Sequence, residues 1–316
     1  MSKNKPKIAI ILPCYNEEKM LPITFVKIHE LLDSLKRDEV ISQESFALFV
    51  DDGSTDKTWE LILLYHSKDE NCRGIKLAAN AGHQNALMAG MMKVKGLVEC
   101  CITMDADLQD DLSAIPVMLA HYSQKSEIVY GVRCDRSTDS YFKHKTAAMF
   151  YSLMKALGVN LLPNHADFRL VGSNALENLS SFREYNLFLR GIFPSMGFKT
   201  ATVEYAQLPR LASETKYSLR KMLTLATRGV TMFSPAPLRL SGLLSIFVFI
   251  AALIQAGMVI IDYSKGITVP GWASLMVIIL FIGSAQLFCN FVMGEYIAMI
   301  FSEVKARPRY IIEEET

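Results

Sequence analysis

The stretch VECCITMDADLQDD, residues 98–111, joins an apolar run to a cluster of acids. The apolar part predicts a strand buried on both faces, and four aspartates then stand within seven residues. Carboxylates packed so closely repel one another and lose hydration, so we expect a positive partner beside them. Oxygen ligands of this kind suit Mg²⁺ or Mn²⁺. The alternative is that Asp110 and Asp111 stabilise the first turn of a following helix.

Four further apolar runs predict strands of the same kind: 8–12, 46–50, 74–78 and 127–131. Helical periodicity separates them, first over residues 21–35. This alternation predicts an α/β fold with a mainly parallel sheet and right-handed crossovers. Ligands of such sheets bind where the strands end. PCYNEE (13–18), DDGSTD (51–56) and DADLQDD (105–111) each follow a strand, so we expect a functional site at that edge.

The DDGSTD segment combines acids with turn residues. Asp51 and Asp52 end the second predicted strand, and Gly53 permits a tight turn. Ser54 or Thr55 is expected to cap the helix that begins near Lys57. The two carboxylates can accept hydrogen bonds from a nucleobase or a ribose, although a simple helix cap is the alternative. Neither GxGxxG nor GxxxxGK[ST] occurs, which removes the main support for dinucleotide and P-loop sites.

The C-terminal third is apolar, within a chain of mean hydropathy +0.22. Residues 241–261 and 272–294 carry no charge, and each has the length of roughly 20 residues that spans a bilayer. Basic residues flank their outer ends: Arg228, Arg239, Lys305, Arg307 and Arg309. This pattern predicts a two-span hairpin in the cytoplasmic membrane with both termini inside, and buried core helices are the alternative. The amphipathic segments 141–157 and 217–233 are either interfacial helices or solvated helices packed on the core.

Taken together, these motifs resemble glycosyltransferase family 2, whose nucleotide-diphospho-sugar transferase fold is termed GT-A. The resemblance rests on the following segments: PCYNEE, VDDGSTDKT (50–58), NAGHQNALMAG (80–90), MDADLQDD, GVRCDR (131–136), ADFRLVGS (166–173) and FLRG (188–191). With the two apolar stretches, the C-terminal half looks most like polyprenyl-phosphate glycosyltransferases of the dolichyl-phosphate mannose synthase and bactoprenol glucosyltransferase types. The segment SETKYS (213–218) keeps the family's Lys and Tyr but lacks its glycine.

The resemblance implies a role for each motif. A metal, Mg²⁺ or Mn²⁺, would be held by Asp105 and Asp107 with help from Gln109, and would bind the donor diphosphate. The donor site would consist of Pro13, Tyr15, Glu17, Asp51, Asp52, Asn80, Gly82, Asp105 and Gln109. The acceptor phosphate would be bound by Arg133, Arg136, Lys143, Lys145 and Lys216, for which solvated surface charge is the alternative.

The catalytic set implied by the resemblance is Asp167, Arg133 and Arg169. Asp167 is expected to be a general base or to orient the acceptor, and a structural salt bridge with Arg169 is the alternative. Arg190 is expected either to support a ligand or to cap a helix. His83 and His165 are expected to be structural histidines, since no zinc-ligand spacing surrounds them.

The expected organisation follows from these assignments. Residues 1–210 form a cytoplasmic GT-A catalytic domain, 211–240 a juxtamembrane helix region, 241–294 the hairpin and 295–316 a cytoplasmic tail. The expected reaction is inverting transfer of a sugar, best guessed as glucose from a UDP-sugar, to polyprenyl (undecaprenyl) phosphate for cell-envelope glycan modification. N-acetylglucosamine, galactose, aminoarabinose or mannose donors stay open, as does a non-catalytic nucleotide-sugar-binding scaffold. A homo-oligomer is suggested by the resemblance, and the net charge of +1 gives no indication of a nucleic-acid partner.

Overall fold

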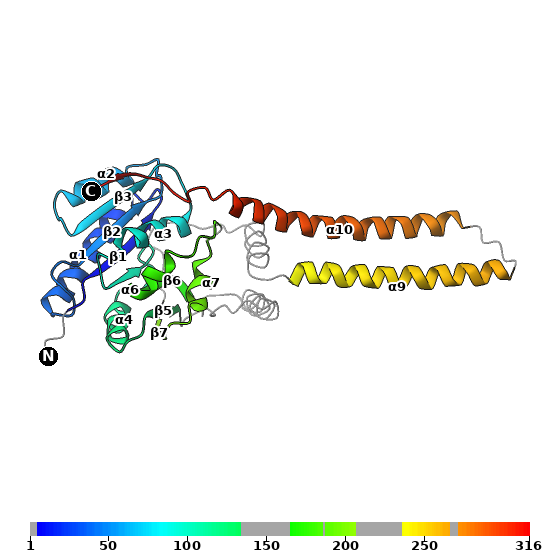
Figure 1. The fold of residues 1–316 in the computed structure, drawn as a ribbon. Coiled ribbons are helices and arrows are strands. Elements are labelled where there is room, and N and C mark those ends of the chain that lie inside the picture. The colour runs from blue at the N-terminus through cyan, green and yellow to red at the C-terminus, as the bar shows by residue number, and fades with distance from the viewer. Residues whose placement is uncertain (1–4, 134–164, 186, 207–235, 266–270) are drawn as a thin grey trace. The chain divides into compact units, whose positions relative to one another are not determined.

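The computed structural model describes residues 5–133, 165–185, 187–206, 236–265 and 271–316 (Figure 1). They divide into two compact units. One is a sheet with its covering helices, which also includes the C-terminal residues 307–316, and the other contains two long helices. The predicted amphipathic segments 141–157 and 217–233 lie outside the described residues.

The sheet of the first unit has eight strands in the described residues, in the order β7-β5-β6-β4-β1-β2-β3-β8. Their bounds are β1 Ile8–Cys14, β2 Phe46–Asp51, β3 Cys72–Leu77, β4 Cys100–Thr103, β5 Ile128–Arg133, β6 His165–Gly172, β7 Thr200–Tyr205 and β8 Ile312–Glu315. All five apolar runs therefore form strands, as predicted. The pairs β1–β2, β1–β4, β2–β3 and β5–β7 are parallel. The predicted α/β fold with a mainly parallel sheet is confirmed.

Helices cover both faces of this sheet. They are α1 Leu21–Arg37, α2 Thr58–His66, α3 His83–Val94, α4 Ala114–Ser123, α6 Ser173–Leu179 and α7 Leu189–Ser195. Alternate residues of β1 point to opposite faces: Ile10 packs in a cluster with α1, α2 and α4, and Ile11 packs in a second cluster with α3, α6 and α7. Burial on both faces explains why β1 and β2 read as continuous apolar runs.

Three strands escaped the sequence prediction. β6 lies antiparallel between β4 and β5, so the fourth and fifth predicted strands are not neighbours. The charges of Asp167 and Arg169 interrupt its apolar pattern. β7 pairs with β5 at one end of the sheet. β8, of sequence IEEE, pairs antiparallel with β3 at the other end of the sheet. There the ammonium group of Lys76 lies 2.9 Å from the carboxylate of Glu313 and 3.2 Å from that of Glu314.

The turn after β2 is as tight as predicted. Gly53 has φ +67°, and a Cβ there would lie 2.6 Å from backbone atoms of Ala79 and Asn80, so only glycine fits without strain. The predicted cap is wrong, because the N–H of Thr58 is accepted at 3.0 Å by the Asp56 carboxylate, not by Ser54 or Thr55.

The helix alternative for the acidic cluster holds for one of the two acids. The helix α4 begins at Ala114, and Asp111 accepts the N–H of the preceding Ser113 at 2.9 Å. Asp110 bonds Tyr205 and Arg133 instead.

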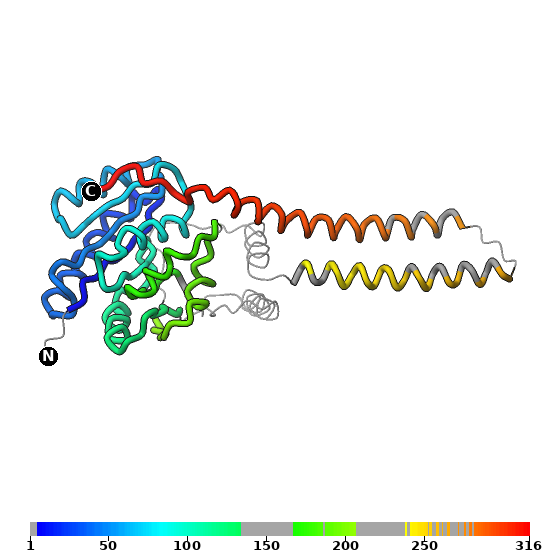
Figure 2. The backbone as a smooth tube through the Cα atoms, viewed as in Figure 1, coloured from blue at the N-terminus to red at the C-terminus, as the bar shows by residue number. Residues whose placement is uncertain are grey.

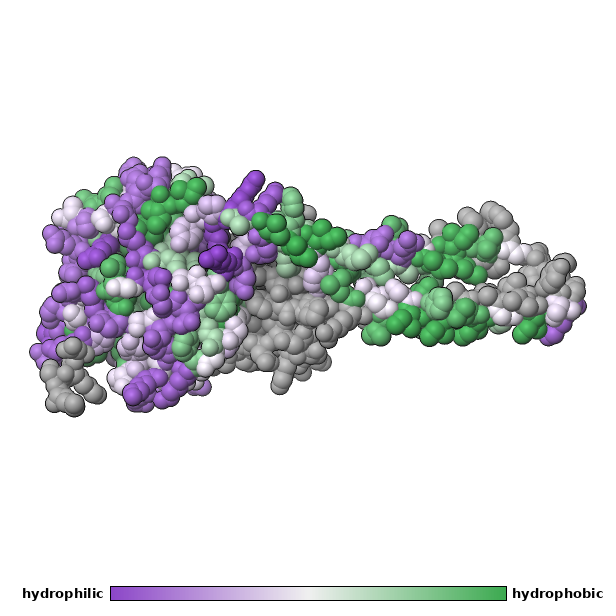
Figure 3. Space-filling model, in the orientation of Figure 1, coloured by the Kyte–Doolittle hydropathy of each residue, from purple (hydrophilic) through white to green (hydrophobic). Residues whose placement is uncertain are grey.

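The second unit consists of α9 Ala236–Ser264 and α10 Trp272–Val304, which lie side by side (Figure 2). By length and composition, one stretch of the described residues, Phe281–Val304, can cross a membrane, and a shorter apolar stretch is Ser241–Ala251. The side chains are largely exposed, as at Leu287 (70%) and Phe291 (64%), and form the apolar surface in Figure 3. The described residues thus support one of the two predicted spans and contradict a buried core helix.

Candidate active site

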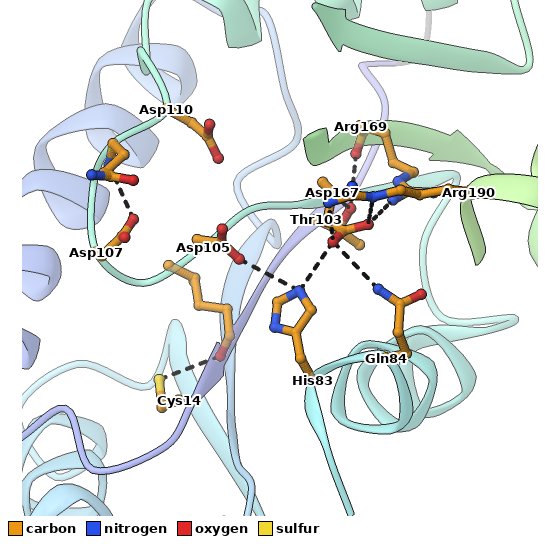
Figure 4. A network of polar contacts seen from close by, with 12 residues as sticks. Cys14, His83, Gln84, Thr103, Asp105, Asp107, Asp110, Asp167, Arg169 and Arg190 are labelled. Carbon is orange, nitrogen blue, oxygen red and sulfur yellow. Dashed lines mark hydrogen bonds and ion pairs between the residues drawn. The ribbon is translucent and has the colours of Figure 1, made fainter. Parts of the chain in front are cut away.

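The acidic loop after β4 turns two carboxylates away from the core. Met104 and Ala106 are buried, whereas the side chain of Asp105 between them is 38% exposed (Figure 4). The loop reverses direction at Leu108, which has φ +53° and is itself buried. This reversal lets the N–H of Gln109 donate to Asp107 Oδ1 at 3.2 Å. This loop lies at the edge where β1, β2 and β4 end, here termed the carboxyl edge. The metal-binding role of Asp105, Asp107 and Gln109 stays a prediction.

Two of the predicted polar clusters are joined by hydrogen bonds. The N–H of Asn16 donates to Ser54 Oγ at 2.9 Å, and its side-chain oxygen accepts the N–H of Thr55 at 2.8 Å. The N–H of Glu17 donates to Thr58 Oγ1 at 2.9 Å. Tyr15 is 48% exposed beside them. The loops after β1 and β2 therefore form one fixed wall of the carboxyl edge.

Three other residues of the expected donor site, Asp51, Asp52 and Pro13, are buried. Asp52 accepts the N–H groups of Ala81 at 2.7 Å and Gly82 at 3.0 Å, so it holds the segment that carries the exposed Asn80. Burial raises the pKa of Asp52 above its ordinary value. Asp51 is fully buried, and so is Pro13 within β1. Contrary to the prediction, neither of these two side chains is available to a nucleoside in this structure.

The carboxylate of Asp167 gathers the donors of four side chains. It accepts from Arg169, from Arg190 at 3.1 Å, from His83 at 3.3 Å and from Gln84 at 3.3 Å (Figure 4). Burial alone would raise the pKa of Asp167, but the hydrogen bond from His83 and the charges of Arg169 and Arg190 hold it well below its usual range. The predicted salt bridge with Arg169 is present.

Arg169 and Arg190 differ in exposure. The side chain of Arg169 is 1% exposed, and its guanidinium packs over the Phe193 ring at 5.0 Å, so it acts through Asp167 and not on a ligand directly. The side chain of Arg190 is 42% exposed and stands in the first turn of α7, bonded to Asp167. This placement favours a ligand-supporting role for Arg190 over a helix cap.

His83 is a functional candidate that the sequence prediction assigned to structure. As the first residue of α3, after Gly82 with φ +89°, it places Nε2 3.6 Å from Asp105 and 3.3 Å from Asp167. Burial alone would lower the pKa of His83, but the hydrogen bond to Asp167 and the charges of both carboxylates raise it. The imidazole therefore joins the acidic loop to the Asp167 cluster. The one sequence signal for His83 was its place in the segment NAGHQNALMAG, which belongs to the family resemblance.

Arg133 stands at the end of β5, within reach of two residues that the prediction did not include. Its Nε donates to the hydroxyl of Tyr205 at 3.1 Å, and its Nη2 lies 3.4 Å from Asp110. The other expected acceptor cations, Arg136, Lys143, Lys145 and Lys216, lie outside the described residues, and so does the side chain of His165.

The acidic loop fits a divalent ion that completes its shell with substrate. Within the described part of the chain, no three His, Cys, Asp or Glu residues form a ready-made metal site. Magnesium, however, usually takes one or two carboxylates together with phosphate oxygens. Although part of its side chain is exposed, loss of hydration raises the pKa of Asp105 to about 6. The negative charges of Asp110, Asp167 and Asp107 add to this rise, and the charge of His83 opposes it. A cation beside Asp105 and Asp107 would relieve this repulsion.

This chain is similar to several known proteins. The model of the family described as glycosyl transferase family 2 matches residues 9–185. The glycosyltransferase YkoT of Bacillus subtilis is 46% identical over 99% of this chain and 93% of its own length. The prophage bactoprenol glucosyl transferase homolog of Escherichia coli is 36% identical over 97% of this chain and 98% of its own. Among solved structures, a mannosyltransferase of Pyrobaculum calidifontis in complex with GDP-Man and Mn²⁺ is 14% identical with a TM-score of 0.46, covering 95% of this chain and 86% of that one.

The Asp167 cluster predicts unequal effects on stability. Replacing Asp167 by Asn leaves the buried Arg169 guanidinium without a counter-charge, so we expect unfolding to become easier by about 3 kcal/mol. Replacing the half-exposed Arg190 by Gln should cost less than about 1 kcal/mol, because water replaces the lost partner. Thermal unfolding of the two variants, followed by circular dichroism, measures the difference. Equal losses would show that the buried pair does not stabilise β6.

Proposed function

Because this chain belongs to glycosyl transferase family 2 and is a glycosyltransferase, we propose that it transfers a sugar from a nucleotide-diphospho-sugar to a polyprenyl phosphate. The observation that carries this proposal is the likeness to bactoprenol glucosyl transferases, which extends through the apolar C-terminal helices as well as the sheet. A lipid acceptor would explain the apolar helices, because they would anchor the protein in the membrane that contains this lipid.

On the donor side, Asp105 and Asp107, with Gln109, would hold Mg²⁺ or Mn²⁺ against the donor diphosphate. The bound ion supplies stabilisation of the charge that develops on the leaving diphosphate. Tyr15, Glu17 and Asn80 would contact the nucleoside. Asp52 keeps Asn80 in place through its two backbone hydrogen bonds. Glucose on UDP is the favoured donor; N-acetylglucosamine, galactose, aminoarabinose and GDP-mannose are the alternatives.

On the acceptor side, a phosphate monoester is already ionised near neutral pH, so its oxygen needs positioning more than deprotonation. Arg133, with Arg136, Lys143, Lys145 and Lys216, would bind this phosphate and shield it from the donor diphosphate. Asp167 is a weak base because its pKa is depressed, which supports the role of orienting Arg190 and His83 over that of a general base.

The proposed reaction is a single displacement. An acceptor phosphate oxygen forms a bond to the anomeric carbon while the bond from that carbon to the donor diphosphate breaks, which inverts the configuration. The nucleoside diphosphate leaves with the bonding electron pair. The products are a polyprenyl-phosphate sugar and the nucleoside diphosphate, formed at the cytoplasmic face for use in the cell envelope. The homo-oligomer stays a prediction.

The decisive experiment measures the lipid product. Purified full-length protein in detergent is incubated with undecaprenyl phosphate, Mg²⁺ or Mn²⁺ and each labelled nucleotide sugar in turn. We expect butanol-extractable label, highest with UDP-glucose, and none after chelation with EDTA. Extractable label from no donor at all would contradict the proposal and favour the non-catalytic scaffold.

Two neighbouring aspartates supply a matched pair for the metal assignment. Asp107→Asn should lower the rate of lipid-product formation by roughly 100-fold or more, because charge stabilisation by a metal contributes several kcal/mol. Asp111→Asn should keep the rate within about twofold, because the Asp111 side chain accepts the N–H of Ser113, which an amide oxygen also does. Full activity of Asp107→Asn in the same assay would refute the assignment.

We further propose that both α9 and α10 cross the membrane, with residues 1–210 and 295–316 in the cytoplasm. Strand pairing supports this topology. Because β8 pairs with β3 in one sheet, the chain must return to the side from which it left, so the number of crossings is even. If Phe281–Val304 crosses, a second crossing has to precede it, and the charge-free residues 241–261 in α9 are the available stretch.

Cysteine labelling tests this topology. Ser264→Cys, at the end of α9, should react with a membrane-impermeant maleimide in intact cells, because the loop between the helices is expected outside. Ser67→Cys, at an exposed position after α2, should react only after lysis. If Ser264→Cys is labelled only after lysis, the two-span topology is wrong.

A further inference from the structure

Three distant segments converge on the guanidinium of Arg133. Arg133 ends β5, Tyr205 ends β7, and Asp110 belongs to the acidic loop after β4. Arg133 and Tyr205 are paired in the parallel register, so their side chains leave the sheet on the same face. The Nε of Arg133 donates to the Tyr205 hydroxyl at 3.1 Å, and this hydroxyl donates to Asp110 Oδ1. Nη2 of Arg133 lies 3.4 Å from the same oxygen.

Asp110 and Tyr205 are buried, whereas Arg133 is partly exposed. Asp110 is 1% exposed and Tyr205 3%, and the Tyr205 ring packs edge-on against the buried Phe168 with a centroid distance of 5.2 Å. The Arg133 side chain keeps 29% of its surface exposed. Two buried groups therefore fix one side of the guanidinium, while part of the side chain stays exposed.

Stability alone is a poor explanation for Asp110. Its Oδ2 is buried and has no hydrogen-bond partner among the described residues, a deficit that typically costs about 1–3 kcal/mol. A residue kept at this position despite such a cost is expected to serve the site.

We propose that Asp110 and Tyr205 are positioning residues that hold Arg133 ready to bind the acceptor phosphate. This inference rests on the proposed function, in which the acceptor is a lipid phosphate. An untethered arginine at this position would turn toward the carboxylate of Asp105, whose charge acts on Arg133. The hydrogen bonds from Nε and from one N–H of Nη2 hold the guanidinium in place and prevent this. The other N–H groups of the guanidinium remain for phosphate oxygens. Holding the guanidinium in place also removes the rotamer freedom that a long side chain would lose on binding.

The test compares Tyr205→Phe in two backgrounds. The hydroxyl is the only group removed, and it acts through Arg133 if the inference holds. In full-length protein in detergent micelles, we expect Tyr205→Phe to weaken equilibrium binding of labelled undecaprenyl phosphate by about tenfold, the size of one hydrogen bond to a charged group. The KM for the nucleotide sugar should stay within about twofold. When Arg133 is already replaced by Gln, adding Tyr205→Phe should change lipid-phosphate binding by less than about twofold.

The control removes a comparable hydroxyl elsewhere. Tyr122→Phe loses a hydrogen bond of 2.8 Å to the Glu99 carbonyl, before the start of β4 and so at the opposite end of that strand from the site. Lipid-phosphate binding should not change in this variant. Circular dichroism verifies that each variant is folded.

The outcomes separate this inference from the proposed function. Equal losses from Tyr205→Phe in both backgrounds, or a raised KM for the nucleotide sugar with unchanged lipid-phosphate binding, would overturn the positioning role alone. If the native protein binds the lipid phosphate but glycosylates it with no donor, the proposed function fails and the binding cycle still decides the inference. If the native protein does not bind the lipid phosphate, both are wrong.

Discussion

Charge balance at the carboxyl edge is the constraint on which the site depends. Acids are placed there by β4 and its loop, and cations by α3, β5, β6 and α7. The strand β6 links the two sets because it lies between β4 and β5 and carries both Asp167 and Arg169. The carboxylate of Asp167 is stable in its buried position because four side chains donate to it. Without them, burying its charge would be strongly unfavourable. Two acids of the loop have cationic partners of their own, since Asp110 lies 3.4 Å from Arg133 and Asp105 lies 3.6 Å from His83.

The part of the fold that the sequence predicts is the part buried on both faces. A strand covered by helices on two sides has to be apolar at every position, so β1, β2 and β4 stand out in the sequence together with the polar residues that follow them. β6 and β8 do not stand out, because both carry charges. Asp167 of β6 pairs with Arg169 and also with His83, a residue distant in the chain. The acids of β8 meet Lys76 and Lys93, which are more than 200 residues earlier.

Much of the candidate site was predictable for a similar reason. Asp105, Asp107 and Gln109 follow a recognisable strand, and the structure places them together. The contributions of His83, Asp110 and Tyr205 depend on register and helix position. Nothing local in the sequence indicates that Tyr205 pairs with Arg133 across two parallel strands, or that the first residue of α3 reaches between two carboxylates. Conversely, local pattern overestimated Asp51, whose carboxylate is buried.

The strand β8 has a consequence for biosynthesis. Thr316, just after β8, exchanges hydrogen bonds of 2.9 and 3.0 Å with Gly74 in β3. Translation proceeds from the N-terminus at about 5–20 residues per second. The side of β3 that pairs with β8 therefore stays without its partner strand for on the order of ten seconds or more. During this time it offers the kind of unpaired strand that attracts other chains. The β8 side of β3 is therefore covered only after α9 and α10 have been made, because both helices precede β8 in the chain.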